Sequence, residues 1–418
     1  MKKFLLFFIL FKIIFSYQYT YIRKNYSDPL AQVPLCIGNK RENIKCHEIP
    51  IDLTYSYILL SPKDYIINDN SKREEYTQEF INYNYYFYKG IKSETIYFLN
   101  SSNCYKQLDD DLHWIAGFKY IKGFQDVNKI GLGACYKGQD EVKELEDNNF
   151  VFALYRNSFI KDLTFSFEPK SKTETIITFG EKITQEYKKC YSSNKLKEII
   201  NNGIEEKNLW NCPLNKIAVD NSDVQFLKGE NNYAIFDSIS EDIQLPYETG
   251  IEILNYINEK TGNKCYFEET KFNGPSQQEF SYSYLICRPG VDVREVPDIK
   301  FIFENFELNL GKNVLLRPHD CCRNRVNILA YKNLKYIKIG VPILKKYHII
   351  FDYLDNSVGI IQDKSYIFIE SKMNNINFYN ISILFIKKLN FIINKQKNIL
   401  VIIIWGLGIG DWGLGIGD

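Results

Sequence analysis

Two segments of this chain end a hydrophobic strand on an aspartate and continue with small hydroxyl residues. The first, residues 49–56, contains Asp52, and the second, residues 234–240, contains Asp237. The two aspartates lie 185 residues apart (237 minus 52), which is about the length of one domain. Either aspartate alone would be an ordinary turn residue at a strand end. Together they indicate a duplicated folding unit in which each copy contributes one carboxylate.

The rest of the central sequence predicts strands more than helices. Short apolar or alternating runs are bounded by Gly, Asn, Asp, Ser and Pro, which is typical of strands and turns. The clearest runs are 49–60, 163–167, 175–179, 234–236, 299–303 and 349–352. Helical patterns are few and short, and the clearest are 139–146 and 249–259, the latter with Ile251, Leu254 and Ile257 on one face. We therefore expect a mostly β protein.

Charge and histidine content exclude several classes of function. The chain has 52 Lys and Arg against 51 Asp and Glu, a formal net charge of +1, which argues against a nucleic-acid partner. Only four histidines occur in 418 residues, which leaves little material for a histidine-based nucleophile or a multi-histidine metal site. Residues 319–322 read His-Asp-Cys-Cys, but no second cluster would complete a tetrahedral site. We expect neither a metal nor a cofactor.

The amino-terminal end and the cysteines indicate export. Residues 1–16 combine a short cationic start, an apolar run and a small residue at the end, as a signal peptide does. An anchor is the alternative, but the run is shorter than the ~20 apolar residues of a spanning helix. Ten cysteines without a C-x-x-C pair are typical of disulfides in an exported chain. Asn25, Asn100 and Asn380 are candidate glycosylation acceptors.

The carboxy-terminal end has a different character. Residues 405–411 read Trp-Gly-Leu-Gly-Ile-Gly-Asp, and residues 412–418 repeat them without change. The apolar stretch 376–404 is divided by lysines into pieces too short to span a bilayer. We expect residues 364–418 to form a low-complexity tail outside the fold, and no stable membrane span in the mature protein.

Further landmarks follow the first aspartate in order. Residues 130–133 read Ile-Gly-Leu-Gly, and the aromatic segment 150–155 follows. Residues 297–301 read Pro-Asp-Ile-Lys-Phe, and residues 340–352 run from a glycine turn to a strand ending in Phe-Asp. With the two aspartates, this ordered set resembles the pepsin-like aspartic proteases over roughly residues 45–362.

The resemblance implies a bilobal fold, with two homologous β-barrel-like lobes around a central cleft. The amino-terminal lobe would span residues 17–205 and carry Asp52, and the carboxy-terminal lobe would span residues 206–363 and carry Asp237. The closing segment would complete the second lobe. Two carboxylates about 3 Å apart cannot both ionise, so one stays protonated while the other acts as a general base on water.

The resemblance also assigns supporting roles around the two aspartates. Ser238 carries the hydroxyl that bonds across to the opposite loop, and Ser240 carries the one expected to bond the second carboxylate. Thr54 and Ile239 stand where the family has glycines, and Leu53 lacks a hydroxyl matching that of Ser238. A β-branched residue at a glycine position restricts the backbone and adds bulk where the loops meet.

Two further features follow from the same resemblance. Tyr83 is the candidate flap tyrosine that would cover the substrate. The carboxy-terminal disulfide would join Cys287 to either Cys321 or Cys322.

Three functions remain open at this point. The leading one is a monomeric aspartic endopeptidase, in a secreted or lysosome- or vacuole-like acidic location, that cleaves extended peptides through Asp52 and Asp237. The second is a catalytically weak or inactive relative that binds peptide or protein in the cleft, which the replacements at Leu53 and Ile239 favour. The third, a membrane-tethered structural protein, depends on the apolar tail alone.

Overall fold

A computed structural model describes the chain in separate segments. The described residues are 17–22, 29–38, 45–54, 58–60, 74–76, 87–89, 95–99, 105–107, 114–117, 129–134, 149–171, 173–180, 187–193, 209–220, 222–224, 232–273, 279–292, 295–311, 316–318, 323–332 and 334–361. Several predicted features lie outside them: the signal peptide at 1–16, the helix at 139–146, Tyr83, the three candidate glycosylation sites, Cys321, Cys322 and the tail at 364–418.

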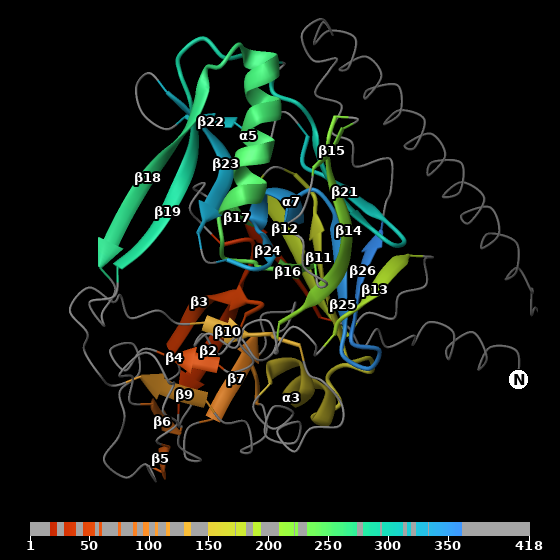
Figure 1. Ribbon diagram of the computed structural model, residues 1–418. Coiled ribbons are helices and arrows are strands. Elements are labelled where there is room, and N and C mark those ends of the chain that lie inside the picture. The colour runs from red at the N-terminus through yellow and green to blue at the C-terminus, as the bar shows by residue number, and fades with distance from the viewer. Residues whose placement is uncertain are drawn as a thin grey trace, which may run out of the picture. The chain divides into compact units, whose positions relative to one another are not determined.

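Strands dominate the described residues, as the sequence predicts, and they form three sheets (Figure 1). The nine-stranded sheet has the order β5 (Glu74–Tyr76), β6 (Phe87–Lys89), β9 (Trp114–Gly117), β4 (Ile58–Leu60), β10 (Lys129–Gly131), β3 (Lys45–Asp52), β2 (Gln32–Gly38), β7 (Thr95–Leu99) and β8 (Tyr105–Gln107). The eleven-stranded sheet follows the path β18 (Cys265–Asn273), β19 (Glu279–Cys287), β23 (Asn324–Tyr331), β17 (Ile243–Pro246), β24 (Ile337–Ile339), β16 (Tyr233–Phe236), β14 (Asn211–Val219), β20 (Ile299–Phe303) and β21 (Glu307–Asn309), with β15 (Ser222–Val224) on β14 and β22 (Leu316–Pro318) on β23. The six-stranded sheet has the order β1 (Tyr17–Ile22), β12 (Glu174–Phe179), β11 (Thr164–Pro169), β25 (His348–Asp352), β26 (Ser357–Ile361) and β13 (Lys188–Tyr191).

These sheets correct the expectation of barrel-like lobes. A barrel closes only when its first and last strands pair. In the described residues each sheet is instead an open path, with different strands at its two edges. The two halves of the chain are therefore built from open sheets.

The predicted duplication is visible in the strand order. The neighbours β9-β4-β10-β3-β2 of one sheet correspond to β23-β17-β24-β16-β14 of the other. Directions agree as well, because both series run parallel, antiparallel, parallel and antiparallel from pair to pair. The strands β3 and β16, which lead to the two aspartates, hold the same place in each series.

The six-stranded sheet combines strands from both halves of the sequence. The closing segment 340–352 does end in a strand with Phe-Asp, but this strand, β25, pairs with β11, where Ser166 lies opposite Ile350. The segment thus completes a sheet that the two halves share. Buried aromatic rings form its core, and Phe165 stacks on Phe351 with centroids 4.7 Å apart.

The longest described helix, α5 (Tyr247–Thr261), confirms the helix expected at 249–259, but its buried face overlaps the expected one only in part. Ile253 and Ile257 are buried, whereas Ile251 and Leu254 are only partly covered. The cause is Gly250, which packs so closely on β23 and β18 that an added Cβ would lie 3.0 Å from the Ala330 side chain. The helix ends at Gly262, whose positive φ of 68° allows its N–H to reach the Asn258 carbonyl.

The described residues also contain two shorter helices. The first, α3 (Phe150–Arg156), begins at Asn149, whose side chain accepts a hydrogen bond from the Val151 N–H. The second, α7 (Val341–Leu344), follows β24 directly and has Pro342 in its first turn, where no intrahelical N–H is needed.

Three disulfides lie within the described residues: Cys36–Cys46, Cys190–Cys212 and Cys265–Cys287. The expectation that Cys287 pairs with Cys321 or Cys322 is wrong. Cys265 stands directly opposite Cys287 in the antiparallel ladder of β18 and β19, so the two side chains meet across adjacent strands.

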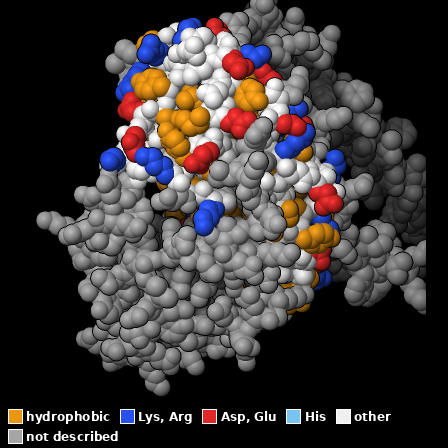
Figure 2. Space-filling view, viewed as in Figure 1, with side chains coloured by type: hydrophobic (Ala, Val, Ile, Leu, Met, Phe, Trp, Pro, Cys, Tyr) orange, Lys and Arg blue, Asp and Glu red, His pale blue; other side chains and the backbone are white. Residues whose placement is uncertain are grey.

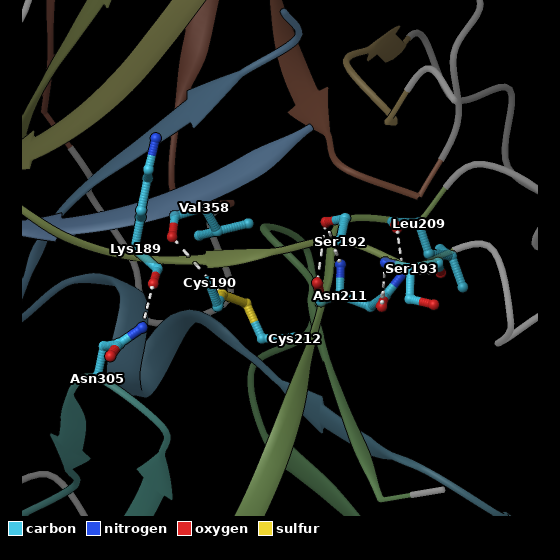
Figure 3. Close-up of a disulfide and its surroundings, with 9 residues drawn as sticks. All are labelled: Lys189, Cys190, Ser192, Ser193, Leu209, Asn211, Cys212, Asn305 and Val358. Atoms are coloured by element: carbon cyan, nitrogen blue, oxygen red, sulfur yellow. Dashed lines mark hydrogen bonds between the residues drawn. A yellow bond between two sulfur atoms is a disulfide. The ribbon is translucent and has the colours of Figure 1, made fainter. Parts of the chain in front are cut away.

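The Cys190–Cys212 disulfide joins two sheets (Figure 3). It connects β13 of the six-stranded sheet to β14 of the eleven-stranded sheet. Beside it, the buried Asn211 side chain accepts from the Ser193 N–H and donates to the carbonyls of Ser193 and Leu209. The start of β14 is thus held by one covalent bond and several hydrogen bonds.

On the face shown in Figure 2, basic and acidic side chains are interspersed around hydrophobic ones. This mixture agrees with the near-zero formal net charge. Among the described residues, no helix has the length and apolar character that crossing a bilayer requires.

Candidate active site

The two aspartates occupy matching ends of matching strands. Asp52 is the last residue of β3 and lies opposite Gly131 of the parallel strand β10. Asp237 directly follows β16, and its N–H donates to the Ile339 carbonyl of the parallel strand β24 (3.0 Å). Both are buried, with 1% of Asp52 and 7% of Asp237 exposed. Parallel pairing therefore fixes the backbone of each aspartate at the point where its strand ends.

Each carboxylate accepts two hydrogen bonds from its own loop. Asp52 Oδ1 accepts from the Thr54 N–H (2.9 Å) and from the Thr54 hydroxyl (2.6 Å). Asp237 Oδ1 accepts from the N–H groups of Ile239 (2.9 Å) and Ser240 (3.0 Å). Both loops are thus turns closed by the aspartate side chain. In the first turn, Thr54 stands where the pepsin-like proteases have glycine, and it donates with its side chain as well as with its backbone.

Ser238 links the second loop to the first. Its hydroxyl donates to the Ile51 carbonyl (2.7 Å) and accepts from the Leu53 N–H (3.2 Å), on either side of Asp52. Its carbonyl accepts from the Leu30 N–H (3.0 Å). Ser238 is fully buried, so these bonds are shielded from water. They bring the loops of Asp52 and Asp237 into direct contact.

Burial is the main influence on Asp237. It raises the pKa of this carboxyl, because the charged form is poorly solvated. The charge of Lys338 lowers the pKa, the negative charge of Asp52 raises it further, and the two N–H donors lower it, with burial prevailing. Asp237 therefore keeps its proton at pH values above the usual titration range of a carboxyl group.

The Ser240 hydroxyl has another role than the one expected from the resemblance. It donates to the Asp242 carbonyl (2.9 Å) and accepts from Gln244 Nε2 (3.0 Å), so the bond from Ser240 to Asp237 comes from the backbone. The Asp242 carboxylate in turn forms a buried ion pair with Arg325 of β23. The Arg325 guanidinium lies 3.7 Å from the centroid of the Tyr284 ring. An ion pair thus fixes the end of the Asp237 loop.

Gly340 lets α7 approach this loop closely. A Cβ at Gly340 would lie 2.4 Å from the Asp242 carbonyl oxygen and 2.6 Å from that of Ser240. The next residue, Val341, donates its N–H to the Ser240 carbonyl (2.9 Å). The glycine of the closing segment is therefore needed for contact with the Asp237 loop.

The structure brings five of the predicted residues together: Asp52, Thr54, Asp237, Ser238 and Ser240. Sequence reasoning missed the Asp242–Arg325 pair, because Arg325 lies among polar residues at the start of β23 and carries no local signal of a partner. It also missed Trp210, which is fully buried and hydrogen-bonded to Leu132 and Phe236. Within the described residues, no group of three His, Cys, Asp or Glu side chains is arranged to hold a metal ion.

Comparisons with known proteins agree with this geometry. The sequence profile of the eukaryotic aspartyl protease family matches residues 118–363, which include Asp237 but not Asp52. A comparison with curated protein sequences finds no match.

Among solved structures, 398 chains match the fold. One is the basic 7S globulin from soybean, with 8% sequence identity, a TM-score of 0.57, and coverage of 83% of this chain and 96% of the globulin chain. At that identity the likeness concerns the fold alone. The family profile covers 246 of the 418 residues (363 minus 118, plus one), more than half. The chain therefore belongs to the eukaryotic aspartyl protease family.

Proposed function

We propose that the protein is an aspartic endopeptidase that hydrolyses peptide bonds at acidic pH with Asp52 and Asp237. The observation that carries this proposal is the contact between the two aspartate loops through Ser238. It places two buried carboxylates, at equivalent ends of duplicated strands, close enough for the charge of one to raise the pKa of the other. Two neighbouring carboxyl groups, one of which has a raised pKa, are suited to joint acid and base catalysis.

In the proposed mechanism, the two carboxyl groups have opposite roles. Asp52, as a carboxylate, takes a proton from water, and the water oxygen attacks the peptide carbonyl carbon. Asp237, protonated because burial raises its pKa, donates its proton to the carbonyl oxygen. When the tetrahedral intermediate collapses, the proton on Asp52 goes to the leaving nitrogen and a hydroxyl proton returns to Asp237. Both groups end the cycle as they began it.

The proposed substrate is a peptide or protein segment in an extended conformation, bound between the two aspartate loops by backbone hydrogen bonds. Family membership supports this proposal, as does the position of both aspartates at strand ends. The three disulfides favour an oxidising environment, and we propose a monomer that is secreted or held in a lysosome- or vacuole-like acidic compartment.

The second candidate function is a relative that binds peptide without cleaving it. The observation that favours it is the one-sided link between the loops. Ser238 supplies the hydroxyl from the second loop, while Leu53, at the equivalent position of the first loop, is a fully buried apolar side chain. Thr54 and Ile239 also occupy the positions of the family's glycines.

Cleavage of an acid-denatured protein by the purified full-length protein distinguishes the two functions. We expect cleavage between about pH 3 and pH 6, and a loss of at least about 100-fold in kcat/KM for Asp52→Asn and for Asp237→Asn. Asparagine keeps the oxygen that accepts the loop hydrogen bonds, so both variants should fold. The matched control is Asp223→Asn, because that carboxylate is exposed and pairs with Lys216.

Each outcome has a clear meaning. Cleavage that neither substitution reduces would exclude the dyad. A wild-type protein that retains the denatured substrate without cleaving it would establish the binding function instead.

A further inference from the structure

The residue that precedes β14, Trp210, is held firmly in place. Its side chain is fully buried. The next two residues are Asn211, whose side chain bonds Ser193 and Leu209, and Cys212, which forms the disulfide with Cys190 (Figure 3). A side chain at this position therefore projects from a backbone with little freedom to move.

Trp210 forms hydrogen bonds toward both aspartate strands. Its indole Nε1 donates to the Leu132 carbonyl (2.7 Å), and the Leu132 N–H donates to the Asp52 carbonyl (2.8 Å). Its own carbonyl accepts from the N–H of Phe236 (3.0 Å), the residue directly before Asp237. Trp210 thus connects to the backbone beside Asp237 by one hydrogen bond, and to the Asp52 backbone by two hydrogen bonds in series through Leu132.

An aromatic cluster supports the indole ring from the six-stranded sheet. Its ring centroid lies 5.0 Å from that of Tyr353, 5.3 Å from that of Phe351 and 6.2 Å from that of Phe165. Phe351 also contacts Phe236, with centroids 6.1 Å apart. Because such a cluster is densely packed, the ring cannot turn without displacing its neighbours.

In the first half of the chain, the position equivalent to Trp210 is Ala31, directly before β2. The matching strand arrangement therefore does not require a large side chain at this position. There, Ala31 accepts from the N–H of Ile51, the residue directly before Asp52, with the same distance of 3.0 Å. Ala31 has no side-chain donor. The indole bond to Leu132 is therefore an addition in the second half, and it reaches the first.

We propose that Trp210 is a positioning residue that sets the spacing between Asp52 and Asp237. This inference rests on the proposed function, since it concerns the same two carboxylates. Their separation determines how strongly the charge of one opposes ionisation of the other. A loss of the indole N–H would let the Asp52 strand shift relative to the Asp237 strand. In an active site, a displacement of about 1 Å can reduce the rate about 100-fold.

The test compares Trp210→Phe with two controls from the same cluster. Trp210→Phe keeps an aromatic ring and removes the indole donor. Tyr353→Phe also removes one buried hydrogen bond, which the Tyr353 hydroxyl accepts from Asn149 (3.0 Å), the residue at the start of α3. Phe165→Leu makes a cavity beside the indole. All three variants should lower the denaturant midpoint of unfolding, so stability alone does not distinguish a positioning role of Trp210 from a structural one.

Two readouts decide between a positioning role and a merely structural one. The first is kcat and KM for a denatured protein between about pH 3 and pH 6. We expect Trp210→Phe to lower kcat about 10- to 100-fold with KM changed less than about threefold, and Tyr353→Phe to stay within about threefold of the wild type. Phe165→Leu keeps the indole N–H but loosens its support, so its kcat should lie between those two values. Equal kcat values for Trp210→Phe and the controls would overturn the proposal.

The second readout needs no activity. The pH dependence of unfolding stability, compared with and without Asp237→Asn, reports the titration of Asp237 in the folded protein. Trp210→Phe should move that titration by about half a pH unit or more toward lower pH, since weaker repulsion by Asp52 eases ionisation. An unmoved titration would overturn the proposal, even if the wild type cleaves nothing. Failure of the proposed function appears separately, as wild-type cleavage that does not depend on the two aspartates.

Discussion

The loops of Asp52 and Asp237 occupy the same place in two matching series of strands, yet they hold their carboxylates with different groups. The first loop uses the backbone and hydroxyl of Thr54, whereas the second uses two backbone N–H groups. The bond between the loops comes from the second, through Ser238. The shared strand order thus preserves the backbone positions of the aspartates, while the side chains around them have diverged.

The second loop carries most of the added support in the described residues. Ser238, the Asp242–Arg325 pair and Trp210 all belong to the carboxy-terminal half, and two of these three reach toward Asp52. The comparison teaches that the first aspartate depends on the second half as well as on its own loop. Substitutions in the second half should therefore disturb both carboxylates.

The largest expected effect follows from breaking the ion pair at the end of the Asp237 loop. Arg325→Leu removes the guanidinium that pairs with the buried Asp242 carboxylate, and we expect a loss of about 3–5 kcal/mol in unfolding free energy. Denaturant unfolding measures it. The control, Lys332→Leu, removes an exposed pair at the end of the same strand and should change the midpoint little.

A second variant tests whether charge pairing is the cause. Replacing both partners, Asp242→Leu with Arg325→Leu, should restore much of the loss, because no unpaired charge remains. A double variant as unstable as Arg325→Leu would contradict this explanation.

The next effect comes from removing the link between the loops. Ser238→Ala leaves the Ile51 carbonyl and the Leu53 N–H buried without this partner, and we expect a loss of about 2–4 kcal/mol in unfolding free energy. The rate of peptide cleavage should fall as well, because the two aspartate loops are then no longer hydrogen-bonded to each other through Ser238. Ser192→Ala is the control, since its hydroxyl also bonds a backbone carbonyl and N–H, those of Asn211, outside the aspartate loops. Equal cleavage by the two variants would show that the link is only structural.

A smaller effect is expected from the side-chain hydrogen bond that Thr54 donates to its aspartate and that Ile239, at the equivalent position, cannot donate. Thr54→Val keeps the shape of the side chain and removes the hydroxyl that bonds Asp52. Because a hydrogen bond to a charged group contributes about 1.5–3 kcal/mol, we expect kcat/KM to fall at least about tenfold. Thr54→Ser keeps the donor and should retain most of the activity. Similar kcat/KM values for both variants would show that the Thr54 hydroxyl has no role in cleavage.

The smallest effect is a pH dependence of stability. Burial first, and the charge of Asp52 in addition, raise the pKa of Asp237. The folded protein then keeps a proton that the unfolded chain releases near pH ~3.9, so stability falls as pH rises through the raised value, by at most about 1.4 kcal/mol per pH unit. Asp237→Asn should remove this slope, and Asp52→Asn should move it to lower pH. Unfolding curves at a series of pH values would show it, and identical slopes in all three proteins would contradict it.

Much of the fold follows from local patterns in the sequence. The run 299–303 forms β20, and the two aspartates end equivalent strands, because alternation and turn residues are local signals. The burial of Ile257 in α5 agrees with the predicted face, but that of Ile253 was not predicted, since it depends on Gly250 bringing the helix against residues far along the chain. The pairing of Cys287 was also wrong, because it depends on the register of β18 against β19.

The site was harder to predict than the fold. Ser238 could be named from its place after Asp237, but the destination of the Ser240 hydroxyl depends on the path of the chain to Asp242. Arg325 meets Asp242 only because β17 and β23 pair in parallel. Nothing in the local sequence of Trp210 indicates a bond to Leu132, 78 residues earlier. Such contacts are products of tertiary structure.

The shared six-stranded sheet has a consequence for how the protein is made. Ser166 and Ile350, which face each other in β11 and β25, are 184 residues apart (350 minus 166). At about 5–20 residues per second, a ribosome needs roughly 10–40 s to synthesise the stretch between them. During that time β11 can pair with β12, but its other edge stays open to wrong partners. Folding of the nascent chain therefore depends on protection of this edge until the last described strands emerge.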